Sequence, residues 1–272
     1  MVRSPEFTEA MLRQESGEVF LSGIQALLRL PLDQHRADRE RGCSTATLIS
    51  GYRGSPLAGL DIALERHKGL LQEHHAVFLS GLNEELGATA VYGSQLANLL
   101  PNPRYDGVLG MWYGKGPGVD RCGDVFKHAN YAGIGPLGGV LAVGGDDPAT
   151  KSSSIPSHSE IAFYDALFPV LFPGNVQEVL DLGRLGFELS RYSGLWVGFK
   201  IVTGVADQVG TANVSPDRFR IVDPGFLYEG RPWQPRQSAV LYPPLTLGTE
   251  REIHLGRLEA GGAVAAAPDR NP

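Results

Sequence analysis

The stretch STATLISGYRGSP, residues 44–56, contains the pattern that decides the fold. Its first part, residues 44–50, is a short run of β-branched and apolar side chains, which predicts a buried strand. Residues 51–56 are rich in glycine and end in proline, which predicts a turn. Leucines then recur on roughly one side of a helix over residues 57–71. The segment is therefore typical of a strand–turn–helix unit.

The same alternation recurs over most of the chain. Short apolar or β-branched runs predict further strands at residues 77–80, 108–113, 139–144, 170–172 and 195–202. Between them we expect helices at residues 84–100, 118–131, 158–167 and 176–192. Strands that alternate with helices favour an α/β fold, with a doubly wound, mostly parallel sheet and helices on both faces.

The composition changes towards both ends of the chain. Residues 1–17 are polar and are expected to form a flexible leader, followed by a helix that Pro31 should kink or break. The α/β domain is expected to span residues 18–223. Residues 224–272 carry seven prolines and few periodic apolar positions, so we expect a linker there. The low-complexity stretch from Ala260 onwards is expected to be a disordered tail.

Charge and cysteine content exclude several classes of function. The 272 residues include 24 Lys and Arg against 30 Asp and Glu, a formal net charge of -6. Without a basic run, the chain has no electrostatic footprint for nucleic acid or for an anionic membrane. Cys43 and Cys122 are too few for a disulfide framework, a four-cysteine zinc site or an all-cysteine iron–sulfur cluster. Residues 1–17 lack the apolar core of a secretory signal, and no run reaches the ~20 apolar residues of a membrane span, so we expect a cytoplasmic protein.

Familiar nucleotide and hydrolase motifs are missing. Gly114-Lys115 resembles the end of a phosphate loop, but Leu109 and Gly116 break the Walker pattern. No G-x-G-x-x-G follows the first strand, and neither a G-x-S-x-G elbow nor an H-E-x-x-H motif is present. The seven histidines show no ligand spacing, so no metal site is expected.

Four polar or glycine-rich clusters instead follow the predicted strands. They lie at residues 51–56, 83–85, 114–118 and 144–148. Open α/β sheets bind their ligands at the carboxyl ends of their strands. For any one cluster a simple turn is the better explanation, but four in succession indicate a binding edge.

Taken in order, these clusters resemble the N-terminal, pyrimidine-binding domain of the thiamine-diphosphate-dependent 2-oxoacid:ferredoxin oxidoreductases. The similarity is greatest to the large subunit of the indolepyruvate enzymes in their long fused bacterial form. It extends from about residue 19 to residue 206. The matching segments are LISGYRGSPLAGLD (48–61), SGLNEELGATAVYGSQ (80–95), YGKGPGVDR (113–121), GGDDPATKSSSIPSHSE (144–160) and NVQEVLDLGRLGFELSR (175–191).

The resemblance implies a catalytic role for Glu84. In this family a glutamate at the start of the helix after the second strand bonds the N1' atom of the cofactor's aminopyrimidine. A carboxyl group at that point can exchange a proton with the ring nitrogen, which begins cofactor activation. The alternative is an ordinary first-turn glutamate that interacts favourably with the helix dipole. Glu85 would point about 100° away around the helix and is expected to be structural.

Other roles implied by the resemblance concern the neighbouring loops. The cofactor-binding residues would be Tyr52, Gly54, Ser55, Pro56, Gly116, Pro117 and Gly118. At Gly116 and Gly118 the missing Cβ atoms would let the backbone approach the cofactor. The substrate-binding residues would be Arg53, Lys115, Asp146 and Asp147, with Arg53 as a carboxylate clamp. Relatives more often carry Pro and Thr in place of Arg53 and Ser55. Solvation is the alternative for Lys115, and a turn or helix cap is the alternative for the two aspartates.

The implied function is the oxidative decarboxylation of indolepyruvate or a related aryl pyruvate to an acyl-CoA, with ferredoxin as electron acceptor. In this family Mg²⁺ with the diphosphate, and the iron–sulfur clusters, are held by other domains, and the similarity ends near Glu259. We therefore expect a fragment that is inactive alone and needs the remaining domains of the enzyme, coenzyme A and ferredoxin as partners, and we expect a homodimer. The alternatives are a non-catalytic interaction module and a thiamine-dependent decarboxylase or transferase subunit.

Overall fold

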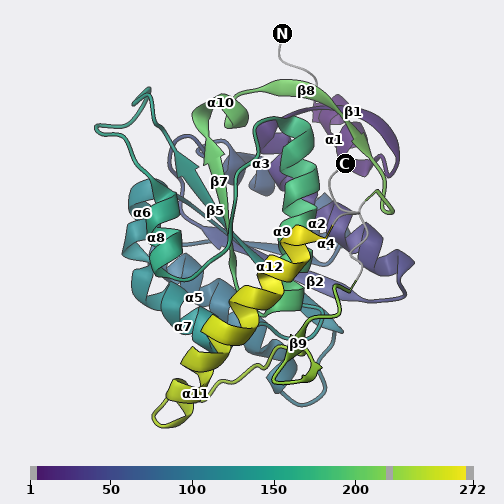
Figure 1. Ribbon diagram of the computed structural model, residues 1–272. Helices are drawn as coiled ribbons and strands as arrows, with labels where there is room; N and C mark the ends of the chain where they lie inside the picture. The colour runs from purple at the N-terminus through teal and green to yellow at the C-terminus, as the bar shows by residue number, and fades with distance from the viewer. Residues whose placement is uncertain (1–4, 219–222, 268–272) are drawn as a thin grey trace.

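A six-stranded parallel sheet forms the centre of the computed structural model, which describes residues 5–218 and 223–267 (Figure 1). The strands lie in the order β3-β2-β4-β5-β7-β6, and every neighbouring pair is parallel. Their bounds are Thr45–Gly51 (β2), Ala76–Ser80 (β3), Gly107–Lys115 (β4), Gly139–Asp146 (β5), Val170–Leu171 (β6) and Val197–Val202 (β7). The predicted α/β fold is confirmed. Both ends of each predicted strand lie within two residues of the corresponding ends of the observed strand.

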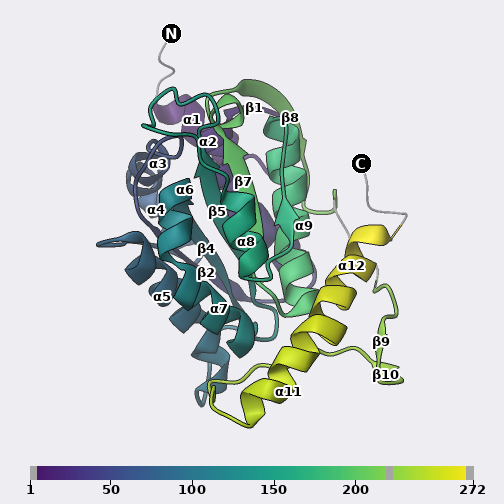
Figure 2. The same ribbon diagram turned by 60° about the vertical axis from the view of Figure 1, so that its left-hand side comes forward.

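Helices cover both faces of this sheet (Figure 2). One face packs against α2 (Gly23–Glu40), α3 (Leu60–Arg66), α4 (Lys68–Glu73) and α9 (Val176–Ser193). The other packs against α5 (Glu84–Gln95), α6 (Gly116–Arg121), α7 (Gly123–Ala132) and α8 (Ser159–Asp165), and a 3₁₀ turn, Leu96–Leu99, follows α5. Within β4, Met111 and Tyr113 face the first layer and Trp112 faces the second, all fully buried. Burial on both faces explains why the central strands β2, β4 and β5 appear as continuous apolar runs, whereas the edge strand β3 exposes Val77 and Leu79 on one face.

The chain before β2 differs from the prediction. Residues 17–22 form strand β1 (Gly17–Ser22), which pairs antiparallel with β8 (Val209–Val214) in a separate two-stranded sheet; a short helix α10 (Thr203–Ala206) precedes β8. Ser22 then caps α2 in a reciprocal capping box with Gln25. The expected break at Pro31 is wrong, because α2 continues through it to Glu40. Since a proline removes only one helix hydrogen bond, the buried leucines on both sides can hold the helix together.

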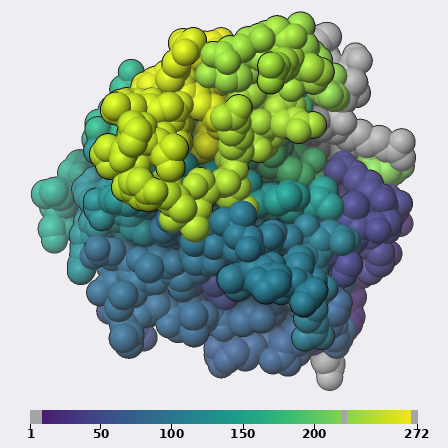
Figure 3. All heavy atoms as spheres, turned by 90° about the horizontal axis from the view of Figure 1, so that it is seen from below, coloured from purple at the N-terminus to yellow at the C-terminus, as the bar shows by residue number. Residues whose placement is uncertain are grey.

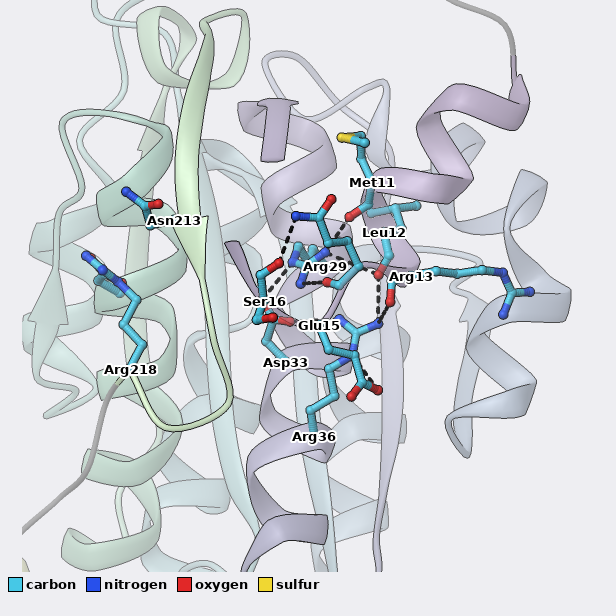
Figure 4. Close-up of polar contacts among 12 residues, drawn as sticks. Met11, Leu12, Arg13, Glu15, Ser16, Arg29, Asp33, Arg36, Asn213 and Arg218 are labelled. Carbon is cyan, nitrogen blue, oxygen red and sulfur yellow. Dashed lines mark hydrogen bonds and ion pairs between the residues drawn. The ribbon is translucent and has the colours of Figure 1, made fainter. Parts of the chain in front are cut away.

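The expected flexible leader is also wrong for residues 5–13, which form helix α1 (Pro5–Arg13). Two fully buried arginines of α2 hold the end of this helix (Figure 4). Arg29 donates hydrogen bonds to the carbonyls of Met11, Leu12 and Gln14, and Arg36 donates to those of Leu12 and Arg13. Asp33 pairs with both guanidinium groups at 2.8 Å. Residues 1–4 of the expected leader lie outside the described residues.

Residues 223–267, the C-terminal arm, pack on the domain instead of forming the expected linker and disordered tail (Figure 3). The arm contains a small hairpin of β9 (Leu227–Tyr228) and β10 (Arg231–Pro232), then α11 (Leu245–Glu252), a π turn (Ile253–Arg257) and α12 (Leu258–Ala266). Trp233, Ile253 and Val264 are buried. The low-complexity run is rich in alanine, a strong helix former, and its small residues let α12 pack closely against α9. Residues 268–272 lie outside the described residues.

Candidate functional site

The site lies at the carboxyl edge of the sheet, where the strand order changes direction. The chain passes from β2 outwards to β3 and then crosses back over β2 to β4. Ligands of open α/β sheets bind at such a switch point. The register pairs Gly51 with both Ser80 and Tyr113, and Lys115 with Gly145. The four predicted clusters therefore follow four strands that end side by side at one edge.

Close approaches between these loops explain several of the glycines. A Cβ atom on Gly54 would lie 3.0 Å from Cβ of Lys115, and one on Gly116 would overlap the Ser157 hydroxyl oxygen. A Cβ atom on Gly118 would lie only 2.5 Å from Cγ of Glu84. Contacts under 3.0 Å cannot be accommodated without movement, so Gly118 is the residue that makes room for the Glu84 side chain.

Glu84 is the first residue of α5 and is fixed mainly through its backbone. Asn83 caps the helix by accepting a hydrogen bond from the Leu86 amide at 2.8 Å. The Trp112 indole donates a hydrogen bond to the Glu84 carbonyl at 2.9 Å. The sequence thus determines where the helix starts, and the neighbouring strand β4 fixes that start in space.

The carboxylate of Glu84 is poorly satisfied. Its side chain is 14% exposed, and its buried Oε2 atom has no hydrogen-bond partner among the described residues. The nearest cation is Arg121 at the end of α6, whose Nη1 lies 3.4 Å from Oε2. Glu85, in contrast, is exposed. A buried carboxylate oxygen without a hydrogen bond is energetically costly and indicates a position prepared for a donor that is not part of the chain.

Cys122 lies just beyond Arg121 and is fully buried. Burial raises the pKa of its thiol well above the usual range, and the negative charge of Glu84 adds to this effect. The thiolate is the reactive form of cysteine, so Cys122 is unsuited to act as a nucleophile or as a metal ligand.

The loop after β2 lies across this edge. The Tyr52 amide donates a hydrogen bond to the Tyr113 carbonyl at 3.0 Å, and the Ser55 hydroxyl is hydrogen-bonded to that of Ser152. Pro56 is buried beside Gly145, whereas Arg53 is exposed. Of the predicted cofactor residues in this loop, Gly54 is the one that lies against Lys115.

Asp146 is fully buried at the end of β5, where residues 157–159 satisfy its carboxylate. It accepts hydrogen bonds from the amide and hydroxyl of Ser159 at 3.0 and 2.8 Å and from the Ser157 hydroxyl at 3.1 Å. The ammonium group of Lys200 lies 3.5 Å away. This arrangement favours the alternative of a loop and helix-start anchor, and a substrate-binding role stays a prediction.

Asp147 shows the same pattern. Its carboxylate accepts hydrogen bonds from the amides of Lys151 and Ser152 at 3.0 and 2.8 Å and from the hydroxyls of Ser153 and Thr203. These bonds, led by that from the Ser152 amide, lower the pKa of Asp147 to about 2. The carboxylate organises the loop that follows β5, as the turn alternative requires.

Sequence reasoning did not assign Trp112 or Arg121 to the site. Trp112 is a fully buried residue of strand β4, and Arg121 is an exposed arginine in the last turn of a short helix. Neither pattern carries a functional signal by itself. Within residues 5–218 and 223–267, no group of three or more His, Cys, Asp or Glu could hold a metal ion, and no helix is long and apolar enough to cross a membrane.

Comparison with solved structures identifies the class of fold. The chain matches a 2-oxoglutarate:ferredoxin oxidoreductase from Magnetococcus marinus, solved with 2-oxoglutarate, coenzyme A and succinyl-CoA bound, with a TM-score of 0.61. The match covers 90% of this chain and 45% of that one at 12% sequence identity. The chain therefore has the fold of part of a 2-oxoacid:ferredoxin oxidoreductase.

Comparison with curated sequences is more specific. The chain is 33% identical to the indolepyruvate oxidoreductase subunit IorA of Pyrococcus horikoshii over 198 residues, which are 72% of this chain and 27% of the relative. It is 27% identical to the IorA subunit of Methanothermobacter thermautotrophicus over 221 residues, 81% of this chain and 32% of the relative. No protein-family model matches. The predicted resemblance to the indolepyruvate enzymes among the 2-oxoacid:ferredoxin oxidoreductases is confirmed, and the chain spans about a third or less of the length of these relatives.

Proposed function

We propose that this chain binds the aminopyrimidine end of thiamine diphosphate in a 2-oxoacid:ferredoxin oxidoreductase, with Glu84 as the proton-exchanging residue. The observation that carries the proposal is the Glu84 carboxylate. It lies at the switch point of the sheet, and its buried Oε2 atom has no hydrogen-bond partner among the described residues. An aminopyrimidine nitrogen is a suitable partner, because it can share a proton with a carboxyl group.

The surrounding residues fit such a ring. Gly118 leaves room beside the Glu84 side chain. Gly54 and Gly116 lie so close to Lys115 and Ser157 that a larger residue at either position would crowd this edge. Thiamine diphosphate supplies a nucleophilic carbon and an electron sink for decarboxylation when it is bound. The residues of this chain would orient the ring and hold or move a proton at Glu84 Oε2.

The substrate-binding part of the proposal concerns two cations. Arg53 is exposed on the loop after β2, and Lys115 is half-buried at the end of β4. Both come from loops that meet at Gly54, so both charges could attract the carboxylate of a 2-oxoacid to the same edge. Because the curated relatives are named indolepyruvate oxidoreductase subunits, we propose an aryl 2-oxoacid such as indolepyruvate as the substrate.

The complete reaction needs groups from outside this chain. We propose that the diphosphate with its Mg²⁺, and the iron–sulfur clusters, are held by other domains, and that the products are an acyl-CoA and reduced ferredoxin. The isolated chain would then be inactive. We further propose a homodimeric, cytoplasmic enzyme.

The test compares two adjacent glutamates in the assembled enzyme. In Glu84→Gln, exchange of the cofactor C2 proton, followed by NMR, should slow by ~10²–10⁴, which is the usual range for a general acid–base contribution. Glutamine preserves the shape of the side chain but cannot exchange the proton. Glu85→Gln, one position along the same helix, should exchange as fast as wild type.

The competing explanation predicts the opposite pattern. If Glu84 only interacts with the helix dipole, Glu84→Gln should lower the free energy of unfolding by ~0.3–1 kcal/mol and leave C2 exchange unchanged. Unchanged exchange would therefore remove Glu84 from the catalytic site.

A further inference from the structure

We propose that Arg121 is a positioning residue for Glu84. Its guanidinium group holds the carboxylate when no cofactor is bound and is displaced when an aminopyrimidine takes the same oxygen. The proposal rests on the proposed function, because it concerns the partner that Glu84 has before the ring arrives.

Helix α6 contacts Glu84 at two points on one helix face. Gly118 lies against Cγ of Glu84, and Arg121, three residues later, places Nη1 3.4 Å from Oε2. Residues three apart on a helix project to the same side, so a single short helix both makes room for the side chain and supplies its counter-charge. A glutamate mostly removed from water needs such a cation nearby, since an uncompensated carboxylate would be costly to bury.

The contact attracts the carboxylate without using its hydrogen-bonding capacity. Charge-assisted N–H···O bonds usually measure about 2.7–2.9 Å, so 3.4 Å is an ion pair and not a good hydrogen bond. Oε2 accordingly keeps its lone pairs available. The Arg121 side chain is 58% exposed, so it can turn into solvent at little cost. Because solvent screens the exposed guanidinium group, the ion pair is weak.

Two other roles for Arg121 make different predictions. A cation in the last turn of α6 could merely interact with the helix dipole, in which case it would be insensitive to Glu84. Alternatively, Arg121 could bind the ligand directly, in which case removing it would weaken binding. The displacement model requires a response to Glu84 and tighter binding when Arg121 is removed.

The first measurement tests the ion pair in this chain without any ligand. In protein labelled at its arginine side chains, NMR should show that the Arg121 guanidinium signals shift and rotate more freely in Glu84→Gln. The matched control Glu85→Gln should leave them as in wild type. Arg121 signals that are identical in wild type and Glu84→Gln would overturn the proposal.

The second measurement tests displacement with a defined probe, 4-amino-5-hydroxymethyl-2-methylpyrimidine. Saturating probe should move the Arg121 signals of wild type towards their positions in Glu84→Gln. Arg121→Gln should bind the probe more tightly, by about two- to fivefold for the loss of a weak, half-exposed ion pair. Arg121→Lys keeps the charge and should bind close to wild type, and Lys127→Gln, which removes an exposed cation from α7, should bind as wild type.

Weaker binding by Arg121→Gln would show a direct ligand contact and overturn displacement. If Glu84→Gln changes the Arg121 signals but the probe binds to no variant, the ion pair is real, while the cofactor role of the site, and displacement with it, is refuted. This outcome separates failure of the proposed function from failure of the Arg121–Glu84 contact.

Discussion

Glu84 at the carboxyl edge of the sheet and Arg257 beneath the C-terminal arm are two buried charges with opposite degrees of hydrogen bonding. At the carboxyl edge, Glu84 has one loose ion pair and an oxygen without a hydrogen bond. Beneath the arm, the buried Arg257 donates to Glu252 Oε1 at 3.0 Å, to the Asn130 carbonyl at 2.6 Å and to the Arg236 carbonyl at 3.0 Å. The difference teaches that a buried charge with a full set of hydrogen bonds can hold a segment in place, whereas the Glu84 carboxylate keeps an oxygen that can accept a further hydrogen bond.

The largest expected effect concerns Arg257, the buried charge that has a full set of hydrogen bonds. Arg257→Met removes one partner from a buried ion pair and leaves two carbonyls without their donor, so the free energy of unfolding in urea should fall by about 3–5 kcal/mol. Arg251→Met is the matched control, because Arg251 is 65% exposed and pairs with the exposed Glu229. Its effect should stay below about 1 kcal/mol. Equal effects of the two changes would mean that the arm is not held by Arg257.

The next largest effect concerns the space that Gly118 leaves for the Glu84 carboxylate. Gly118→Ala places a Cβ atom 2.5 Å from Cγ of Glu84 and should displace the carboxylate. Misplacement by about 1 Å can cost ~10²-fold in rate, and we expect that loss in the assembled enzyme. Gly123→Ala is the control, because nothing lies within 4 Å of the added atom at the start of α7. Full activity of Gly118→Ala would show that the room beside Glu84 is not needed.

A third prediction concerns a buried group far from the site. His35 is held between the hydroxyls of Thr45 and Thr47, and burial lowers its pKa to about 4. Below about pH 6.5 the unfolded chain therefore binds a proton that the folded chain does not, so stability is complete above that pH and is lost as the pH falls towards 4. Between pH 7 and pH 5 the loss from this group should be about 2 kcal/mol.

Urea unfolding at both pH values checks this third prediction. The pH dependence should be smaller by about that amount in His35→Gln. His128→Gln, which removes a histidine that is 56% exposed, is the matched control for this measurement. An identical pH dependence in wild type and His35→Gln would mean that His35 is already accessible to protons in the folded protein.

The smallest effect sharpens the comparison within helix α5. Gly93 faces open space, so Gly93→Ala should raise the free energy of unfolding by about 0.5–1 kcal/mol, as expected for alanine inside a helix. A Cβ atom on Gly87 would lie 2.9 Å from the Gly51 backbone, so Gly87→Ala should be destabilising. Thermal unfolding of the two variants measures both signs, and a loss of stability in Gly93→Ala would indicate that this face of α5 is covered.

Local sequence was misleading where packing overrides propensity. Pro31 normally interrupts a helix, yet α2 continues through it between fully buried leucines. The alanine- and glycine-rich stretch from Ala260 has little complexity, yet Ala260 and Val264 are fully buried in α12. In both cases the stabilising contacts come from residues distant in the sequence, which a local pattern does not contain.

The sequence by itself determined the alternation of strands and helices, because the central strands β2, β4 and β5 are buried on both faces and therefore appear as apolar runs between turns. It also determined the position of Glu84, because Asn83 is a strong helix cap whatever surrounds it. Only the tertiary structure decided that Arg121 and Trp112 meet Glu84. These residues belong to a different strand and helix, and the parallel pairing of β2 with both β3 and β4 is what brings their ends together.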